Sequence, residues 1–435
     1  MDTVRADRLS CYGYARPTTP AVDAFAAEAI RFEHAYSVSS WTLPSHASLF
    51  TGLPPNIHRA NQRHWRLDGQ FQTLAELLRA RGYATAAFSE NPWVGHRTGL
   101  SQGFDVMEEL WRQDQHDDEE AAPHVTNERI AEWLDRRNPT QPFFLFVNFI
   151  EAHYPYAPPQ PYRDRFVPAD ANPGDLSAAQ IRWTEWYLNG RSISAPAVAL
   201  RSDLYDAEVA RDDAAVGELL GLLRRRGAYE KSLIVVTADH GENLGNRGHV
   251  DHVFSLYNDT LHVPLLIRRP DGLAGGTRRA DPAQLTDVFS TIAGASGIAV
   301  RDPSIEGVDL LVMTTADTRP IVAEYDYPDQ AIDAFPPAMR NAPALDPFRR
   351  DLRSIQIGRQ KLIWGSDGRH ELYELDGAYR EQTDRFAKAP DVAAQLEAQL
   401  AAVVGARDAS GAPPASVVAA DAATRERLRA LGYTD

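Results

Sequence analysis

The amino-acid sequence predicts an α/β fold in which a largely parallel sheet lies between helices. Short and almost entirely apolar segments, such as 143–150, are typical of strands that are buried on both faces of a parallel sheet. These segments alternate with stretches of helical spacing over most of the chain, as in proteins built from βαβ units. After about residue 345, short strands separated by turns predict a small antiparallel sheet, followed by a helix.

The elements expected in the first half follow from apolar spacing and turn residues. A helix opens at Thr19-Pro20 and continues to Ile30, with apolar residues about 3.6 positions apart. A second helix, 71–81, is followed by Gly82, a residue typical of helix C-termini. Extended segments are expected at 32–36, 83–88 and 143–150, and the last of these runs into a proline-rich loop.

The second half begins with residues 160–200, which look like an insertion, and continues with a long helix at 204–225. Buried strands are expected at 232–238 and 263–267, and the antiparallel meander at 354–357, 360–364 and 371–375. A helix near 390–404 and an Ala/Ser/Pro-rich linker complete the chain. We therefore expect a catalytic domain over 1–340 and a C-terminal subdomain over 341–435.

The composition and charge of the chain limit the classes of function that it can have. The 435 residues are 43% hydrophobic and 24% charged, which suits one large folded domain with a smaller one appended. A formal net charge of −15 argues against non-specific nucleic-acid binding, which needs a basic surface. An acidic protein that handles a small anionic ester therefore needs a local positive centre, most simply a metal ion.

The chain offers few signals about its compartment. Cys11 is the single cysteine, so no intrachain disulfide can form, and no stretch reaches the roughly 18 apolar residues of a membrane span. No signal peptide pattern is visible, so the chain as given reads as cytoplasmic. No apolar strand precedes Asp2, so we expect the first strand to begin upstream of Met1, which leaves export open. The sequence predicts no oligomeric state.

A loop that leads into a helix, Ser40 to Gly52, carries a candidate nucleophile. Pro44 suits an early helical position, and Ser45 and Ser48 could bind the free backbone N–H groups there. Such a helix start stabilises anions, and the hydroxyl of Thr42 would lie just ahead of it. By itself the pattern is more often an ordinary capped turn.

A second group of polar residues follows the predicted strand 232–238. Asp239 and His240 lie side by side on a turn, and a carboxylate beside an imidazole suits Mg²⁺, Ca²⁺, Mn²⁺ or Zn²⁺. The following glycine-rich segment adds His249 and His252, while His153 follows the strand 143–150. Taken singly, an Asp-capped turn and a loop histidine are ordinary features. Because each polar group lies past the carboxyl end of a strand, we expect them to meet at one edge of the sheet.

These motifs together resemble those of the sulfatase branch of the alkaline phosphatase superfamily. The matching stretches run nearly from end to end: 2–14, 42–52, 99–105, 153–159, 239–242, 256–267, 361–363, 371–375 and 427–433. The resemblance implies an alkaline-phosphatase-like fold with a mixed, largely parallel sheet. It also implies a small C-terminal domain of the sulfatase type.

Position by position, the resemblance also implies roles for eight residues. It implies one divalent metal, with Ca²⁺, Mg²⁺ or Mn²⁺ expected and Zn²⁺ a further candidate. Asp2, Asp239 and His240 match the metal ligands. Thr42 matches the nucleophile, which also touches the metal. Three further matches concern the substrate: His153 and His252 with its anionic group or leaving oxygen, and Asn91 with either. His46 stands among the catalytic residues where the family usually has arginine.

Two departures from the family pattern affect the chemistry. Sulfatases convert a cysteine or serine at the nucleophile position to formylglycine, whereas oxidation of Thr42 would give a ketone, so no formylglycine is expected. Thr3 stands where many sulfatases have a second metal-binding aspartate, so a ligand could come from elsewhere, such as His249 or His252. An unmodified threonine suits direct covalent catalysis and phosphoryl transfer.

The leading hypothesis is a metal-dependent hydrolase of sulfate or phosphate esters that uses Thr42. A phosphodiesterase or phosphoglycerol-type transferase with one or two metals is the first alternative, with His249 and His252 near the second ion. A catalytically inactive sulfatase-like binding protein is the second alternative. Metal analysis together with a panel of ester substrates would separate the three.

Overall fold

The structure, a computed structural model, describes residues 1–112, 124–188, 190, 192–313, 319–333, 335–377, 380–408 and 426. Its central strands form two sheets with the orders β5-β8-β1-β9 and β3-β2-β4. The strands of these sheets are β1 (Ile30–Tyr36), β2 (Ala84–Ser89), β3 (Val106–Glu109), β4 (Phe143–Asn148), β5 (Ile234–Thr237), β8 (Leu265–Arg268) and β9 (Arg278–Gln284). The short pair β6 (Asn243–Leu244) and β7 (Val250–Asp251) lies outside both sheets.

Strand directions confirm the predicted mixed, largely parallel α/β fold. β2 runs parallel to β3 and β4, and β1 runs parallel to β9, whereas β8 is antiparallel to both β1 and β5. The register of β2 with β4 pairs Ala84 with Phe143 and Ser89 with Asn148, so both strands end at the same level. The residues that follow them therefore lie next to each other.

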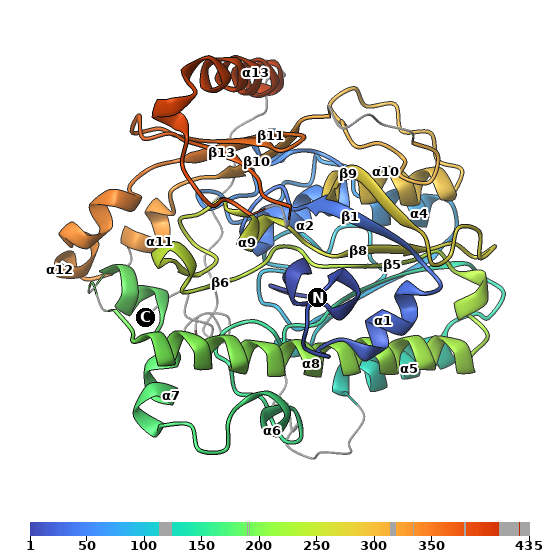
Figure 1. Cartoon of the computed structure of the whole chain (residues 1–435). Coiled ribbons are helices and arrows are strands. Elements are labelled where there is room, and N and C mark those ends of the chain that lie inside the picture. Colours follow the sequence, from blue (N-terminus) through green and yellow to red (C-terminus); the bar gives the residue numbers. More distant parts are fainter. Residues whose placement is uncertain are drawn as a thin grey trace.

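Helices cover the strands from two sides. Figure 1 shows α8 with α1 and α5 on one side and α2, α4 and α10 on the other. The helices are α1 (Pro20–Ala26), α2 (Thr42–Thr51), α3 (Pro55–His58), α4 (Leu74–Ala80), α5 (Val125–Arg136), α6 (Tyr162–Phe166), α7 (Pro173–Ala179), α8 (Ala195–Arg225), α9 (Asn258–Leu261), α10 (Leu285–Ala295), α11 (Asp329–Asp333), α12 (Pro337–Arg340) and α13 (Pro390–Asp408).

The first residues of the chain join the two central sheets. The amino group of Met1 donates a hydrogen bond to the carbonyl of Thr237 at the end of β5 (3.0 Å). The N–H of Asp2 donates to the carbonyl of Phe149, just past β4 (2.8 Å). Asp2 is thereby held between the carboxyl ends of strands from both sheets.

The C-terminal part is the predicted antiparallel sheet with a helix upon it. β10 (Ile321–Tyr325), β11 (Leu352–Ile357), β12 (Gln360–Gly365) and β13 (Glu371–Glu374) pair in sequence order, and Figure 1 shows α13 lying over them. Ala393, Leu396 and Leu400, spaced three and four residues apart, pack on Ile355 and Leu362. β10 belongs to the C-terminal sheet but precedes residue 341, where the C-terminal subdomain was predicted to begin. The boundary between the two predicted domains stays a prediction.

Two helix predictions were wrong in their limits. The helix expected from Thr19 to Ile30 ends at Ala26. Ile30 instead belongs to β1, where it pairs with Ile267 of β8, and this strand pairing overrides the helical spacing. The helix expected from 204 begins at Ala195, because the Ser194 hydroxyl caps it by accepting from the N–H of Ala197 (3.2 Å). The expected insertion, 160–200, therefore contains α6, α7 and the start of α8. The Ala/Ser/Pro-rich linker and the stretch 427–433 lie outside the described residues.

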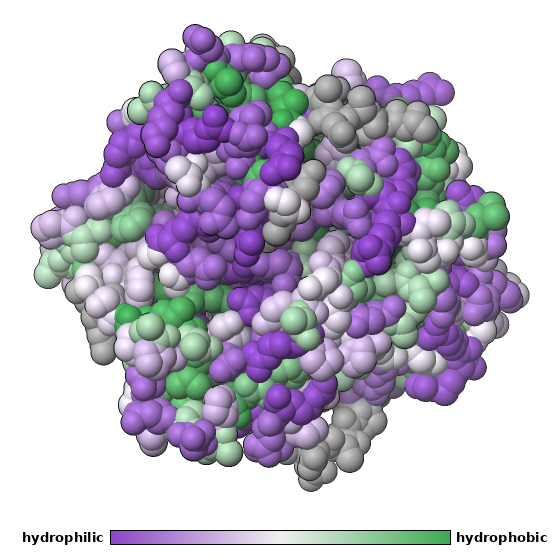
Figure 2. Space-filling model, viewed as in Figure 1, coloured by the Kyte–Doolittle hydropathy of each residue, from purple (hydrophilic) through white to green (hydrophobic). Residues whose placement is uncertain are grey.

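The surface agrees with the acidic, polar composition. The face in Figure 2 is mainly hydrophilic, with apolar residues in small dispersed patches. In the described part of the chain, no helix combines the length and the apolar character that crossing a membrane requires.

Candidate active site

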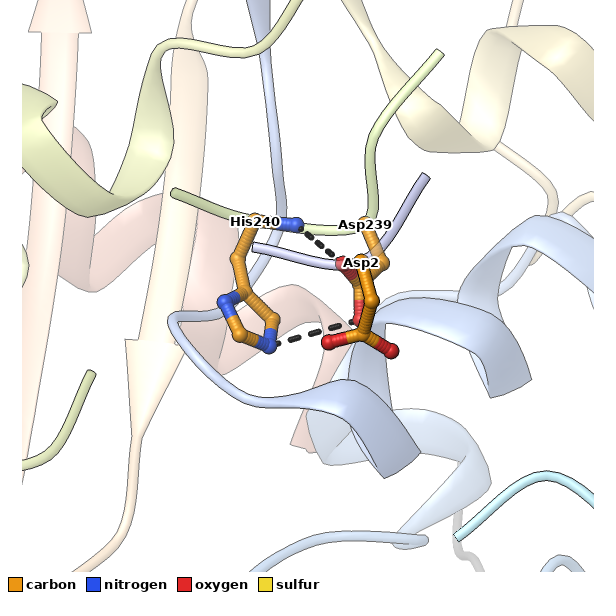
Figure 3. Close-up of side chains that lie close together, drawn as sticks. All are labelled: Asp2, Asp239 and His240. Atoms are coloured by element: carbon orange, nitrogen blue, oxygen red, sulfur yellow. Dashed lines mark hydrogen bonds and ion pairs between the residues drawn. The ribbon is translucent and has the colours of Figure 1, made fainter. Parts of the chain in front are cut away.

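Three buried side chains meet where the two central sheets join. Asp2, Asp239 and His240 each offer one ligand atom, and these atoms all lie within 4.8 Å of one another. Figure 3 shows the two carboxylates and the imidazole ring turned toward a common point. Asp239 and His240 follow β5, and Asp2 is anchored beside β4, so the strand ends place all three.

Hydrogen bonds fix both carboxylates and leave one oxygen of each unused. Asp239 Oδ1 accepts from the backbone N–H groups of Thr3 (3.2 Å) and His240 (2.9 Å). Asp2 Oδ2 accepts from the side-chain amides of Asn91 (2.7 Å) and Asn148 (3.2 Å). Among the described residues, Asp2 Oδ1 and Asp239 Oδ2 have no hydrogen-bond partner, although both are buried.

The free oxygens and the imidazole fit a divalent cation. His240 Nδ1 donates to the carbonyl of Gly241 (2.9 Å), which leaves Nε2 as the basic nitrogen, 3.3 Å from Asp239 Oδ2. Buried carboxylate oxygens without donors are costly unless a cation or a proton neutralises them. Two carboxylates and one oriented imidazole form a donor set that Mn²⁺, Zn²⁺, Mg²⁺ and Ca²⁺ can use.

The pKa shifts of Asp2, Asp239 and His240 also favour a bound cation. Burial and the neighbouring Asp2 charge raise the pKa of Asp239 to about 7. Burial alone would raise the pKa of Asp2, but His153, His240 and His46 hold it below its usual value. Burial lowers the pKa of His240, so its ring is neutral, which is the form that binds a metal.

Thr42 is the first residue of α2 and lies against this cluster. Its Oγ1 is 3.3 Å from His240 Nε2 and 3.5 Å from the amide nitrogen of Asn91. Trp41 occupies the N-cap position without a capping side chain, so its side chain accepts from none of the first N–H groups of α2. The threonine is fully buried by its surroundings.

The expectation that Ser45 and Ser48 cap this helix was wrong. The Ser45 hydroxyl donates to the carbonyl of Ser39 (3.2 Å) and lies 2.9 Å from Ser37 Oγ. The Ser48 hydroxyl pairs with His58 Nε2 (2.9 Å). Both serines therefore hold α2 against neighbouring loops, since helix residues past the first turn face the packed side rather than the open end.

The other predicted residues are also close. His46 Nδ1 donates to the carbonyl of Thr42 (2.9 Å) and lies 3.6 Å from Asp239 Oδ2. The rings of His240 and His252 have centroids 4.5 Å apart, and those of His252 and His153 are 5.1 Å apart. Burial, with the charges of His240 and His153, lowers the pKa of His252 well below its usual value, so its ring is neutral.

His249 lies in different surroundings. Its Nδ1 is 3.1 Å from the Tyr187 hydroxyl, and its ring packs near Tyr257 and Phe348. Within the described ranges, the groups of three or more possible metal ligands include neither His249 nor His252. The second metal position considered for these two histidines therefore has no matching cluster.

Two further residues position the cluster, and of these only Asn148 was not singled out from the sequence. Asn148 ends β4 and donates to Asp2, and its position at a strand end was the available signal. Thr3 adopts a left-handed φ of 55°, held by its N–H to Asp239 and by a hydrogen bond from the Tyr205 hydroxyl to its carbonyl (2.6 Å). Such a conformation costs a non-glycine residue roughly 1–3 kcal/mol, and it turns the chain so that Asp2 reaches the cluster.

Comparison with known protein families shows which family this chain belongs to. The family model described as Sulfatase matches residues 1–298. This chain belongs to the sulfatase family. The ulvan-active sulfatase of Formosa agariphila is 28% identical over an alignment of length 336 that covers 71% of this chain and 62% of that protein. The choline-sulfatase of Rhizobium meliloti is 26% identical over an alignment of length 421 that covers 84% of this chain and 77% of that protein.

Solved structures agree with the sulfatase fold. The phosphonate monoester hydrolase of Agrobacterium radiobacter superimposes with a TM-score of 0.72 at 21% identity, covering 94% of both chains. At this identity the likeness shows the fold alone. Membership of the sulfatase family, with these relatives, supports a hydrolase of sulfuric esters.

Proposed function

We propose that this sulfatase-family chain hydrolyses an anionic sulfate, phosphate or phosphonate ester, with Thr42 as the nucleophile. One observation carries the proposal: the Thr42 hydroxyl lies at the start of α2, 3.3 Å from His240 Nε2 and beside Asn91. A hydroxyl in this position meets the anionic substrate with positive backbone potential behind it.

We assign Asp2, Asp239, His240 and Thr42 as ligands of one divalent cation. The support is the pair of buried carboxylate oxygens without hydrogen-bond donors among the residues described. When bound, such an ion supplies positive charge that lowers the pKa of a hydroxyl and stabilises charge on ester oxygens.

The residues of the chain divide the reaction between them. Thr42 Oγ1 gives up its proton to solvent and attacks the sulfur or phosphorus atom, and the bond from that atom to the leaving oxygen breaks. His153 donates Nδ1–H to the Tyr154 carbonyl (2.5 Å), so Nε2 is the atom offered to the leaving oxygen. As the imidazolium, the ring gives its Nε2 proton to that oxygen, which departs as the alcohol, and the ring regains a proton from the water that attacks next. Water then cleaves the Thr42 ester, which restores the hydroxyl and releases the inorganic acid.

The remaining predicted residues bind and orient. Asn91 presents its amide to Thr42 and Asp2, so it can donate to a non-bridging oxygen of the ester. The neutral His252 ring can donate one N–H to the same group. His46 fixes the first turn of α2 through the carbonyl of Thr42, and it brings imidazole rather than guanidinium to that position.

The nucleophile favours phosphorus over sulfur as the reacting atom. A formylglycine hydrate can expel sulfate by re-forming its aldehyde, whereas the Thr42 ester must be broken by attack of water at the central atom. Hydrolysis of a threonine phosphate or phosphonate by this route parallels the covalent intermediates of other hydrolases. We therefore place phosphate and phosphonate esters first and sulfate esters second.

The test compares Thr42→Ala with Thr42→Ser as the matched control. Each variant is assayed on an aryl sulfate, a phosphomonoester, a phosphodiester and a phosphonate ester, with metal content measured in parallel. Thr42→Ala should lose at least about 10³-fold in kcat with its metal retained, whereas Thr42→Ser should keep most activity because it keeps the hydroxyl. Intact mass of the serine variant checks that it carries no aldehyde.

Two outcomes would contradict the proposal. Unchanged turnover in Thr42→Ala would exclude Thr42 as the nucleophile. A metal-loaded wild type that cleaves none of the four esters would favour the inactive binding protein. If an added alcohol captures the phosphoryl group in place of water, the chain is a transferase that uses the same nucleophile.

A further inference from the structure

A second cluster of buried titratable side chains lies outside the candidate active site. Glu90 follows β2, Glu151 lies just past β4, and His124 is the N-cap residue of α5. One ligand atom from each of the three lies within 4.8 Å of the others. The parallel register of β2 and β4 places the two carboxylates at the same level.

The contacts of this cluster orient its members. His124 Nε2 is 2.6 Å from Glu151 Oε1, and His124 Nδ1 is 3.6 Å from Glu90 Oε1. The backbone N–H of Ile150 donates to Glu90 Oε2 (3.0 Å), and the Thr126 hydroxyl donates to Glu90 Oε1. Glu90 and Glu151 are both buried, so the two carboxylates share a dry environment.

Asp212 on α8 supplies a fourth group that faces this cluster. It is 0% exposed, and neither of its carboxylate oxygens has a hydrogen-bond partner within the described ranges. The start of α5 lies on the same stretch of α8, because the Asn127 amide donates to the carbonyl of Ala215 (3.0 Å).

The charges that act on Asp212 agree with a position on the side of α8 that meets the start of α5. Burial and the Glu151 and Glu90 charges raise the pKa of Asp212 well above its usual range, against the opposing charges of the Met1 amino group and His124. Burial and the Glu151 charge likewise raise the pKa of Glu90 to about 8. Two buried carboxyl groups thus lie beside His124, and the charges of both act on the third, Asp212.

We propose that Glu90, His124, Glu151 and Asp212 form a second divalent-cation site, separate from the one at Asp2, Asp239 and His240. Three carboxylates and one imidazole suit a first-row transition ion such as Mn²⁺ or Zn²⁺, which an imidazole nitrogen binds more readily than it binds Ca²⁺ or Mg²⁺. His124 and the Arg211 charge act on Glu151, whereas a divalent ion would neutralise the remaining carboxylates and give the Asp212 oxygens a partner.

The spacing of the ligands fits such an ion. With bonds of about 2.1 Å, opposite ligands of a transition ion are at most about 4.2 Å apart, and the ligand atoms of Glu90, His124 and Glu151 lie within 4.8 Å of one another, so these three need to move only slightly. The ion would join the ends of β2 and β4 to α5 and α8. Glu90 and Glu151 also stand one and two positions before Asn91 and His153, so the site would stiffen the loops that carry those residues.

Metal stoichiometry of the full chain tests the proposal. The protein is stripped with a chelator and titrated with Mn²⁺ alone and, separately, with Zn²⁺ alone. Wild type should bind two equivalents, Asp239→Asn one, Asp212→Asn one, and the double variant none. The second equivalent should bind at least about 100-fold more weakly in Asp212→Asn.

Asp213→Asn is the matched control on the same helix. Asp213 accepts from the N–H groups of Ala21 (2.9 Å) and Val22 (2.7 Å), so it faces α1 instead of the cluster, and its variant should keep both equivalents. If Asp239→Asn binds no ion, the second site does not exist. Two equivalents in Asp212→Asn would also overturn the proposal.

Asp239→Asn keeps the test valid if Asp212→Asn does not fold, because it leaves the second cluster intact. If Asp239→Asn keeps both equivalents while Asp212→Asn loses one, the second site stands and the metal assignment in the proposed function fails.

Discussion

Acidification should weaken the packing of the helix that carries Thr42, through His58. This histidine is 1% exposed at the end of α3. Its Nδ1 accepts from the N–H of Ala60 (3.1 Å), so the ring proton is on Nε2, which pairs with the Ser48 hydroxyl of α2 (2.9 Å). A protonated ring could not accept from Ala60.

The size of the stability loss follows from the shift in the pKa of His58. Burial lowers the pKa of His58 from 6.5 to about 3. Between pH 6.5 and pH 3, His58 therefore binds a proton in the unfolded chain but not in the folded chain. The contribution of neutral His58 to the free energy of unfolding is complete above pH 6.5 and is lost as the pH falls toward 3. At 1.36 kcal/mol per pH unit, the free energy of unfolding drops by about 2 kcal/mol between pH 7 and pH 5.

The assay compares the melting temperatures of wild type and His58→Gln at pH 7.5 and pH 5.0. With an unfolding entropy of about 2.1 cal/mol/K per residue, 2 kcal/mol corresponds to about 2 °C for a chain of this length. Wild type should lose about 2 °C more than His58→Gln on acidification. The exposed His96, replaced in the same way, serves as the control and should follow wild type. Equal losses in wild type and His58→Gln would refute the argument.

Two further predictions concern the candidate site and the C-terminal sheet. Asn91→Ala should lower metal affinity and kcat/KM about 10–100-fold, because Asp2 loses its 2.7 Å hydrogen bond from the Asn91 amide. Calorimetric titration measures the affinity and initial rates measure kcat/KM. An unchanged metal affinity would count against Asp2 as a metal ligand. Lys361→Met should destabilise the fold by up to about 3–5 kcal/mol, because the buried Glu381 carboxylate loses its 2.7 Å ion pair with Lys361 Nζ and keeps the longer contact to Arg247 (3.5 Å). Urea unfolding measures the loss, and a change below about 1 kcal/mol would show that Glu381 finds another partner.

The sequence determined the features that local physics controls. Apolar runs predicted β2, β4 and β5, although most residues of β4 and β5 are half-buried and not buried as expected, and short strands separated by turns predicted the C-terminal meander. Polar residues just past those runs predicted where a site would lie, since strand ends meet at one edge. The motifs around Thr42 and Asp239 indicated the family, which the match over residues 1–298 shows.

Only the tertiary structure decided how individual atoms are used. The N–H of Thr3 satisfies one oxygen of Asp239 from 236 positions away and leaves the other free, and no local pattern encodes that choice. Spacing could not separate His252, which stacks near His240, from His249, which packs against aromatic rings. Asp212 reads in sequence as one of many charges on a long helix, and only the folded chain shows that it is buried on the stretch of α8 that meets the start of α5. A charge pattern is local, but the loss of water around a charge depends on every element packed against it.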